Sequence, residues 1–485
     1  MRLSAIAHAL SVTLPLCSDP DVISVTHNSA WVEPGCLFVA MRGARHDGHS
    51  FIQDALARGA VAIVGEGFAG APELPVPYLC VADARAALAD SAACLYGNPS
   101  DHLTIVGVTG TKGKTTTAWL TRHLLQMGGH RVGLLSTLGY KLGDEELQHF
   151  PAHFTTPEAP QVQATLARIL ADGCTHAVVE ASSEALAQQR LRGARFAAAI
   201  WTNLAPEHLN FHKTMEGYFA AKRILMDASP FQILNADDPW SMRLVDRPHA
   251  TYACTSRAGA DWQALHITEL NEAVAFELRH PAGLVSLTLP LLGGYNVSNA
   301  LAAMAAAAHL GVPMERMLLG IETFAGVPGR MQVIQAAPFR VVLDFAHTPP
   351  SLEAALTSLR RTTERRLIVV IGSAGGPRDP GKRAPLGETS ARLADLAVLT
   401  EEDCRDTPIW DILNEMHRGA IESGLHNTTL IPDRYEAIRF AFAEAQPGDT
   451  VVLCGKAGEE TLERATETLP WDEESIAREL LNALA

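Results

Sequence analysis

The sequence lacks the features of disulfide-rich, membrane-spanning and general nucleic-acid-binding proteins. Its eight cysteines lie far apart without a C-x-x-C pair, which argues against a disulfide scaffold or zinc knuckle and fits a reducing compartment. No uninterrupted apolar run reaches the about 18 residues of a spanning helix, and His8 breaks the N-terminal apolar stretch. The net charge of −15 opposes a broad nucleic-acid or anionic-membrane surface. We therefore expect a cytoplasmic protein that binds no nucleic acid and inserts into no membrane.

The most informative segment that is present is a glycine-rich loop between an apolar run and a helical pattern. Residues 103–108 are short, apolar and β-branched, as in a buried parallel strand, and 118–127 have helical apolar spacing. The loop between them places Gly110 and Gly113 before Lys114 and Thr115. Glycines let backbone amides approach a polyphosphate, the lysine adds a charge, and the threonine hydroxyl can bind Mg²⁺. The sequence therefore predicts a phosphate-binding loop, although Val108 stands where the common pattern has glycine.

The length and the turn residues predict three α/β domains. A chain of 485 residues with 47% hydrophobic residues can form about three cores. Turn chemistry at 98–100 and at 327–330 places the boundaries, which gives domains 1–100, 101–330 and 331–485. We expect a mostly parallel central sheet and a doubly wound C-terminal sheet. The expected strands are 35–40, 60–64, 103–108, 177–179, 198–201, 232–234, 339–345, 366–371, 396–400 and 450–454.

Several further motifs along the chain share one resemblance. They are Trp201-Thr202-Asn203-Leu204, Glu207-His208-Leu209-Asn210-Phe211-His212, Tyr218-Phe219-Ala220-Ala221-Lys222, Asn235-Ala236-Asp237-Asp238, Gly294-Tyr295-Asn296-Val297-Ser298-Asn299-Ala300, Gly326-Val327-Pro328-Gly329-Arg330 and Asp344-Phe345-Ala346-His347. Together with the loop they resemble the Mur ligases of bacterial cell-wall synthesis. Residues 34–40 with 47–49, and 180–183, look most like the MurE type, which adds the third amino acid to UDP-MurNAc-L-Ala-D-Glu. The resemblance implies a nucleotide-sugar domain, a P-loop ATPase domain and an amino-acid domain.

The resemblance also implies the chemistry and its residues. In this family ATP phosphorylates a substrate carboxylate, and the incoming amine attacks the acyl phosphate. The positions that match nucleotide contacts are Gly110, Thr111, Gly113, Lys114, Thr115, Thr116, Asn296, Asn299, Arg330 and Asp344. For both asparagines the alternative is helix capping, and for Arg330 and Asp344 it is a hinge salt bridge.

Two sets of four positions match the family's catalytic and metal-binding residues. The catalytic positions are Lys114, Glu180, His208 and Lys222. The metal-binding positions are Thr115, Glu180, His208 and Lys222, and Lys222 matches a lysine that is carbamylated to support Mg²⁺. A buried lysine can supply the neutral amine that carbon dioxide attacks. The alternatives are a solvated strand end for Glu180, a helix cap for His208 and an exposed helical lysine for Lys222. The spacing of His208 and His212 also permits zinc, which the Mg²⁺-nucleotide site makes the weaker choice.

The substrate positions divide between the sugar peptide and the added amino acid. For UDP-MurNAc-dipeptide they are Ser29, Thr155, Thr156, Ser182 and Arg190, although Thr-Thr-Pro is also an ordinary turn. For a free diamino acid they are Arg383, Asp403, Arg405, Gly455 and Glu459. A clamp of Arg383 and Arg405 on a distal carboxylate favours meso-diaminopimelate narrowly over L-lysine or L-ornithine. The alternative is that Arg405 only pairs with Asp403 or Asp406.

Some positions depart from the family pattern, and these departures keep other functions open. Where the family has Asp-Ser-Arg, this chain has Asn28-Ser29-Ala30, and where the family has Ser-Ser-His, it has Ser182-Ser183-Glu184. The family's Asp-His-Leu-Asp is replaced by Glu207-His208-Leu209-Asn210, and its Gly-Lys-Gly-His-Glu by Gly455-Lys456-Ala457-Gly458-Glu459. A folylpolyglutamate synthetase shares the loop but lacks the first domain. A non-catalytic nucleotide-binding regulator would be expected to lose Lys114, Glu180, His208 or Lys222, and all four are present. We therefore expect an active ligase. We also expect it to be a monomer.

Overall fold

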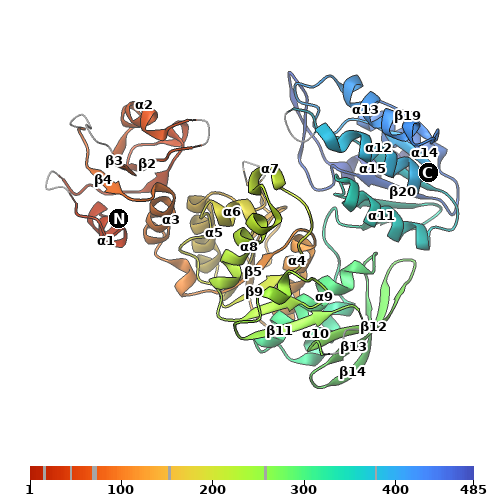
Figure 1. Ribbon diagram of the computed structural model, residues 1–485, viewed down its shortest axis with the longest axis horizontal. Helices are drawn as coiled ribbons and strands as arrows, with labels where there is room; N and C mark the ends of the chain where they lie inside the picture. Colours follow the sequence, from red (N-terminus) through yellow and green to blue (C-terminus); the bar gives the residue numbers. More distant parts are fainter. Residues whose placement is uncertain are drawn as a thin grey trace. The chain divides into compact units, whose positions relative to one another are not determined.

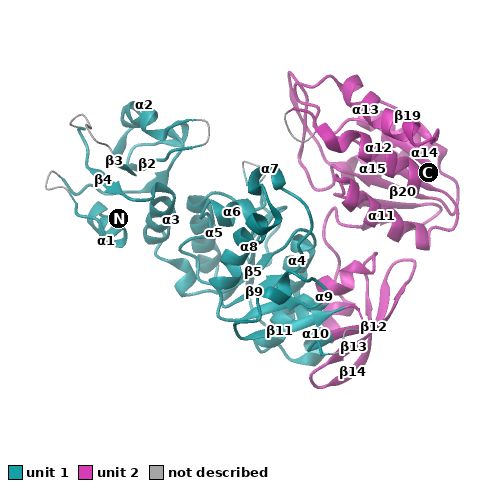
Figure 2. Cartoon of the chain, viewed as in Figure 1, with its two compact units in different colours: residues 1–253, 257–262, 301–317 teal, residues 254–256, 263–300, 318–485 magenta. Residues whose placement is uncertain are grey.

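The computed structural model describes residues 1–14, 18–43, 46–67, 74–150, 154–255, 259–376 and 380–484. Cys17 lies outside the described residues. The chain forms two compact units, shown in two colours in Figure 2. Unit 1 comprises residues 1–253, 257–262 and 301–317, and unit 2 comprises 254–256, 263–300 and 318–485. The division falls inside the stretch expected to form the central domain, and the boundaries near residues 100 and 330 stay a proposal.

Unit 1 begins with a four-stranded parallel sheet (Figure 1). In spatial order its strands are β1 (Ser24–Thr26), β2 (Cys36–Ala40), β3 (Ala60–Glu66) and β4 (Tyr78–Val81). Successive side chains of β2 point to opposite faces. Leu37 and Val39 pack with α1 (Leu3–Ala9) and α3 (Ala84–Leu95), whereas Phe38 and Ala40 pack with α2 (Ile52–Ala57). Helices on both faces explain why all of β2 is buried.

The second sheet of unit 1 places the phosphate-binding loop at its centre. In spatial order, the strands of this ten-stranded sheet that lie in unit 1 are β11 (His249–Ala253), β10 (Gln232–Asn235), β9 (Ala198–Trp201), β5 (Thr104–Thr109), β8 (His176–Glu180), β6 (Val132–Ser136) and β7 (Gly139–Lys141). All are parallel except β7, which is antiparallel to β6. The helices of this part are α4 (Lys114–Met127), α5 (Ala159–Ala171), α6 (Ser183–Ala187), α7 (Leu209–His212) and α8 (Met215–Asp227). The chain order reverses around β5, and ligands of such sheets bind at the carboxyl ends of the strands at that point.

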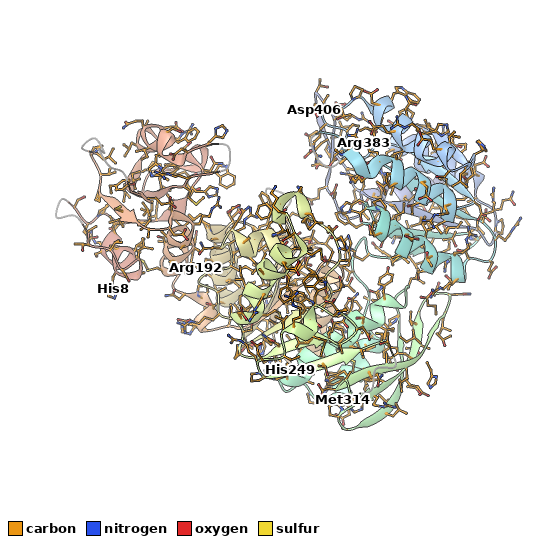
Figure 3. The ribbon with its side chains drawn as sticks, viewed as in Figure 1. His8, Arg192, His249, Met314, Arg383 and Asp406 are labelled. Atoms are coloured by element: carbon orange, nitrogen blue, oxygen red, sulfur yellow. The ribbon has the colours of Figure 1, made fainter. Side chains whose placement is uncertain are left out.

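Polar contacts join the first sheet's helix α3 to the turn that follows α6. Arg192, labelled in Figure 3, donates a hydrogen bond to Asp90 of α3 at 2.9 Å. Gln189 donates another to Asp83 at 2.7 Å, and the Ser100 hydroxyl donates to the Gly193 carbonyl oxygen at 3.1 Å. The two sheets of unit 1 are therefore connected through side chains as well as through the chain.

Unit 2 contains an antiparallel meander that the sequence patterns did not predict. Its strands are β12 (Trp262–Glu269), β13 (Val274–His280) and β14 (Gly283–Leu289). Many of their residues are exposed, so they form no continuous apolar run. The helices that follow, α9 (Tyr295–His309) and α10 (Met314–Glu322), are divided between the two units. The alanine-rich stretch of α9 is buried.

The C-terminal sheet of unit 2 is doubly wound, as expected. In spatial order its strands are β15 (Gln332–Gln335), β16 (Arg340–Asp344), β20 (Thr450–Cys454), β17 (Leu367–Ile371), β18 (Leu396–Leu399) and β19 (Thr428–Leu430), all parallel except β15. One face packs on α11 (Pro349–Thr362), α12 (Arg383–Leu393) and α13 (Ile409–Glu422). The other face packs on α14 (Arg434–Glu444) and α15 (Glu473–Leu484). A hairpin of β21 (Thr461–Glu463) and β22 (Thr468–Pro470) precedes α15.

A buried ion pair connects the last helix to this sheet. Arg434, at the start of α14, is fully buried and donates to the Glu473 carboxylate at 3.0 Å. Its other nitrogens donate to the carbonyl oxygens of Glu401 at 3.1 Å and Cys454 at 2.8 Å. Glu473 of α15 therefore compensates a cation that also supports the ends of β18 and β20.

The expected strands agree with the structure to within two residues at each end. Each is an apolar, β-branched run that is buried on both faces. In the described ranges, no helix combines the length and the apolar character that membrane crossing requires.

Candidate active site

The loop between β5 and α4 has a backbone shape that requires glycine. Gly110 has φ +149°, and a Cβ added there would lie 1.8 Å from the Thr202 hydroxyl oxygen. Thr202 Oγ1 donates to the Lys112 carbonyl oxygen at 2.6 Å, and Asn203 Oδ1 accepts from the Lys112 amide at 3.0 Å. Gly113, with φ +83°, begins α4. The segment after β9 thus holds the loop in a single conformation.

The first turn of α4 suits a phosphate chain. The residue before this helix, Gly113, makes no side-chain capping bond, and the first turn of a helix is a favourable place for an anion. Lys114 Nζ donates to the carbonyl oxygens of Gly110 at 3.1 Å and Thr111 at 3.0 Å. The Thr115 and Thr116 side chains are buried in the same turn. The loop therefore brings together all six residues that were expected here to contact a nucleotide.

Glu180 is the last residue of β8 and is fully buried. This burial contradicts the alternative of a solvated strand end. The Thr137 hydroxyl donates to Glu180 Oε2 at 2.7 Å, and the Thr137 amide approaches the same oxygen at 3.3 Å. Because β5, β8 and β6 are parallel neighbours, Glu180 and Thr137 lie at the sheet edge that carries the phosphate-binding loop.

Lys222 lies on α8 and is only 1% exposed, unlike an ordinary helical lysine. Its Nζ donates to the Gly110 carbonyl oxygen at 2.6 Å and lies 4.6 Å from the centre of the Tyr218 ring. Burial lowers the pKa of Lys222 well below its usual value, the nearby Lys114 lowers it further, and Glu207 opposes the change. The side-chain nitrogens of Lys114 and Lys222 therefore both contact the Gly110 carbonyl oxygen. The lowered pKa favours the neutral amine form of Lys222.

His208 lies at the start of α7 with φ +56°, and its side chain is half exposed. Burial lowers the pKa of His208 below its usual value. His208 Nδ1 lies 3.6 Å from Glu184 Oε1, and His212 lies within hydrogen-bond distance, 2.9 Å, of the Ser183 hydroxyl. No group of three or more His, Cys, Asp or Glu residues suited to a metal occurs among the described residues.

Two departures from the family pattern lie opposite basic side chains. Glu184 faces His208, as given above, and Glu207 Oε1 accepts from Lys112 Nζ at 2.8 Å. Burial raises the pKa of Glu207, but Lys112 outweighs this effect and the pKa is lowered. Of the two, only Glu184 adds a carboxylate, because it replaces the family's histidine whereas Glu207 replaces an aspartate. Neither departure removes Lys114, Glu180, His208 or Lys222.

The residues expected to contact the sugar peptide adjoin Glu180. The Thr156 hydroxyl donates to the Glu180 carbonyl oxygen at 2.7 Å and accepts from the Ser182 amide at 3.0 Å. Arg190 donates to the Thr156 carbonyl oxygen at 3.0 Å, and the hydroxyls of Thr137 and Thr155 are 3.2 Å apart. The Thr-Thr-Pro turn is thus attached to the end of β8.

Ser29 lies in a short 3-10 helix, Ser29–Trp31, in the first sheet's region of unit 1. Asn28, which replaces the family's aspartate, accepts a hydrogen bond from the Ala30 amide at 3.0 Å. A cavity of about 210 Å³ is lined by residues of this region and of α5, including His27, Trp31 and Glu158. Burial lowers the pKa of His27 even though Glu158 opposes the shift.

In unit 2, the two expected asparagines share one face of α9. Asn299 donates to Asn296 Oδ1 at 2.8 Å, and Asn296 donates to the Leu292 carbonyl oxygen at 2.7 Å. Both side chains are buried. The spacing of three residues brings them together on the helix.

Arg330 and Asp344 flank the link to the C-terminal sheet. The Arg330 guanidinium lies 4.2 Å from the centre of the Phe345 ring. Asp344 ends β16 and accepts from the amides of Met331 at 2.8 Å and Ala346 at 2.9 Å. The carboxylate therefore orders the backbone on both sides of this link.

The residues expected to bind the diamino acid lie at the carboxyl end of the C-terminal sheet. Gly455, with φ +101°, follows β20, and Asp403 and Arg405 follow β18. Arg383 and Asp406 both lie toward the upper edge of unit 2 in Figure 3. The segment after β18 lines a cavity of about 400 Å³, whose other charged residues include Asp433 and Arg464.

Both arginines of the expected clamp bond to carboxylates of the chain. Arg405 donates to Glu463 at 2.7 Å and lies 3.4 Å from Asp403, the pairing considered as the alternative from sequence. Arg383 donates to Glu415 at 3.2 Å. Sequence reasoning named Asp403 but missed Glu463 as a partner, because it lies 58 residues after Arg405.

Sequence reasoning also missed Thr137, whose hydroxyl contacts Glu180. The available signal was its position, since a polar residue follows an apolar strand directly. Asn203 stood within a recognised motif without an assigned role, and its role is to hold the Lys112 amide.

Comparisons with known proteins agree with this geometry. Three family descriptions match the chain: "Mur ligase family, catalytic domain" over residues 21–96, "Mur ligase middle domain" over 108–307, and "Mur ligase, glutamate ligase domain" over 329–457. The chain belongs to the Mur ligase family, as a member of the MurE type. It is therefore an ATP-dependent ligase of peptidoglycan precursor synthesis.

Named relatives of this MurE-type ligase match along nearly their whole length. The UDP-N-acetylmuramyl-tripeptide synthetase of Deinococcus radiodurans is 57% identical, with 99% of each chain covered. The UDP-N-acetylmuramoyl-L-alanyl-D-glutamate–2,6-diaminopimelate ligase of Geobacillus kaustophilus is 37% identical, with 95% of each covered. A solved structure of a ligase with that second name has a TM-score of 0.67 at 30% identity, covering 96% of this chain and 95% of its own.

Proposed function

We propose that this ligase joins a diamino acid to the glutamyl carboxylate of UDP-MurNAc-L-Ala-D-Glu, with ATP activating the carboxylate as an acyl phosphate. One observation carries the proposal: Lys114, Lys222 and Glu180 converge on the loop at the carboxyl end of the parallel sheet in unit 1. Lys114 is within reach of a terminal phosphate bound at α4 and would stabilise charge on the transferred group.

The donor set around this loop fits Mg²⁺. Thr115 supplies a hydroxyl at the start of α4, and Glu180 supplies a buried carboxylate held by Thr137. Mg²⁺ prefers oxygen ligands and is often bound through one or two carboxylates together with substrate phosphates. We propose that Thr115, Glu180, His208 and a carbamylated Lys222 hold it. When bound, the ion would neutralise charge on the phosphates.

Carbamylation of Lys222 is supported by the burial of its amine. Carbon dioxide reacts with the neutral amine, and burial and Lys114 both favour that form. The product is an anion, so the change would replace a repelling charge near Lys114 with an attracting one. Residues Thr155, Thr156, Ser182 and Arg190 would place the peptide carboxylate near this site, because they adjoin Glu180.

The remaining assignments follow the family resemblance. We propose nucleotide contacts for Asn296, Asn299, Arg330 and Asp344, and a uridine contact for Ser29. We further propose that the ligase acts as a cytoplasmic monomer with domains 1–100, 101–330 and 331–485. A molar mass of one chain by light scattering during size-exclusion chromatography would test the monomer.

The direct test of the function is ADP release with defined substrates. The proposal expects release only when ATP, UDP-MurNAc-L-Ala-D-Glu and a diamino acid are all present, with one new amide for each ADP by mass spectrometry. ADP release that does not depend on the sugar peptide would contradict it.

The acceptor amino acid has two candidates with different support. The retained Arg405 and Arg383 favour meso-diaminopimelate, whose distal end carries a carboxylate. The pairing of Arg405 with Glu463 and Asp403 favours L-lysine or L-ornithine, whose distal end is only an ammonium group. Direct competition between the three amino acids decides between these candidates.

We expect Arg405→Ala to weaken the use of meso-diaminopimelate selectively. Removing a partly buried partner of a distal carboxylate should cost roughly 2–5 kcal/mol of binding. The measurement is KM for diaminopimelate and for L-lysine, with Arg418→Ala, at an exposed side chain of α13, as the control. Equal effects on both amino acids would show that Arg405 acts only on the local fold.

A further inference from the structure

Glu463, the last residue of β21, contacts the acceptor segment through both its backbone and its side chain. Its Oε2 accepts from Arg405 Nε at 2.7 Å, and its carbonyl oxygen accepts from the Arg405 amide at 3.1 Å. Its own amide donates to Asp403 Oδ1 at 2.9 Å. These bonds attach the hairpin β21–β22 to the segment after β18, and they bring one more carboxylate to Arg405.

The contacts continue as a chain of alternating charges. Asp403 Oδ1 also accepts from Lys456 Nζ at 2.8 Å, and Lys456 pairs with Glu459 as well. Burial opposes the charged form of Lys456, but Glu459 and Asp403 outweigh it and raise the pKa of this lysine. Lys456 therefore stays protonated, and its positive charge attracts the Asp403 carboxylate. Along this series of contacts, as far as the described residues show it, the three carboxylates Asp403, Glu459 and Glu463 alternate with the two cations Lys456 and Arg405, and Glu463 is the carboxylate at the Arg405 end.

These contacts limit the number of N–H donors that the Arg405 guanidinium can offer to a ligand. A guanidinium has five N–H donors in a fixed fork. In the structure Nε contacts Glu463, Nη2 contacts Asp403, and Nη1 contacts the Gly375 carbonyl oxygen at 3.4 Å. A distal carboxylate must compete with the negative charge of Glu463, whereas a distal ammonium is attracted by it. A charge that repels one ligand class contributes to specificity as much as one that attracts.

We propose that Glu463 is a specificity-determining residue of the ligase. Acting through Arg405, it lowers the preference for diamino acids with a distal carboxylate relative to those with only a distal ammonium. The proposal rests on the proposed function, since it takes the segment after β18 as the acceptor site.

The test is the isosteric variant Glu463→Gln, which keeps an oxygen for Arg405 Nε and removes the charge. For wild type and variant, kcat and KM are measured with meso-diaminopimelate and with L-lysine, and an inhibition constant replaces KM for an amino acid that does not react. We expect the ratio of specificity constants, diaminopimelate over lysine, to rise about tenfold, mostly through KM, with kcat nearly unchanged.

Three further variants separate the charge from the fold of the hairpin. Glu463→Asp keeps the charge and should stay near the wild-type ratio. Glu467→Gln removes a half-exposed carboxylate from the same hairpin, where it pairs with Arg464 at 3.4 Å, and should leave the ratio unchanged. In an Arg405→Ala background, Glu463→Gln should no longer change the ratio, because the residue through which it acts is gone.

The outcomes distinguish this inference from the function on which it rests. An unchanged ratio of specificity constants in Glu463→Gln overturns the inference. So does a change of equal size in the Arg405→Ala background. In both cases, turnover by the wild type still supports the ligase function. A wild type that uses no diamino acid overturns both. A Glu463→Gln protein that unfolds at a lower temperature without a shift in the ratio shows a purely structural residue and also overturns the inference.

Discussion

Replacing Lys114 with alanine is expected to slow ADP release by about 10²-fold or more, because one preorganised charge next to a transferring phosphoryl group contributes on that scale. The side chain lies at the start of α4 and donates to two loop carbonyl oxygens, so its removal leaves no cavity in either sheet. The measurement is a coupled ADP assay at saturating substrates, with thermal unfolding as the check on the fold.

Lys112→Ala is the matched control for this experiment. Lys112 lies in the same loop, but its side chain is 42% exposed and pairs with Glu207. Exposed pairs of this kind contribute up to about 1 kcal/mol, so the loss should stay well below that of Lys114→Ala. Near-normal ADP release from Lys114→Ala would contradict the assignment of the loop to ATP.

The second large effect is expected for Lys222→Ala, which should be nearly inactive and should recover in part when a small carboxylate such as formate is added. The carboxylate would occupy the position of the carbamate and restore an anion beside the phosphate-binding loop. Lys222→Met, which retains a long apolar stem, is the companion variant in case the buried site does not tolerate alanine.

Two observations check this explanation independently of turnover. Wild type supplied with ¹³C-bicarbonate should show a carbamate carbon signal by NMR, and Lys222→Ala should lack it. Lys213→Ala, at an exposed lysine that precedes the same helix, should keep both the signal and the activity. An active Lys222→Ala protein that does not respond to carboxylate would exclude the carbamate.

Local signals were sufficient for much of the fold and for part of the site. The phosphate-binding loop is a contiguous stretch, and its glycines, lysine and threonines identify it before any fold is known. The expected strands, such as β9 and β20, are apolar runs buried on both faces, and runs of this kind are recognisable from composition alone. Asn296 and Asn299 are hydrogen-bonded because helix geometry relates residues three apart, which is a local relation.

The contacts that a local signal cannot predict are those that cross the fold. Lys222 and the Gly110 carbonyl oxygen are 112 residues apart, and nothing near Lys222 indicates that its amine is buried. Thr137 meets Glu180 only because β6 and β8 are neighbours in the sheet. The β12–β14 meander escaped prediction since its half-exposed strands resemble loops in composition. Arg405 had an evident charge, but its partner Glu463 comes from a distant hairpin.

The buried pair of Arg434 and Glu473 has a practical consequence for handling this protein. The last helix begins at Glu473, whose carboxylate neutralises Arg434. Arg434 also donates to the carbonyl oxygens of Glu401 and Cys454. These two residues come directly before the segments that carry Asp403 and Gly455. A chain shortened at its C-terminal end would leave this guanidinium buried without its counter-charge. Purification tags at that end should therefore extend the final helix rather than replace it.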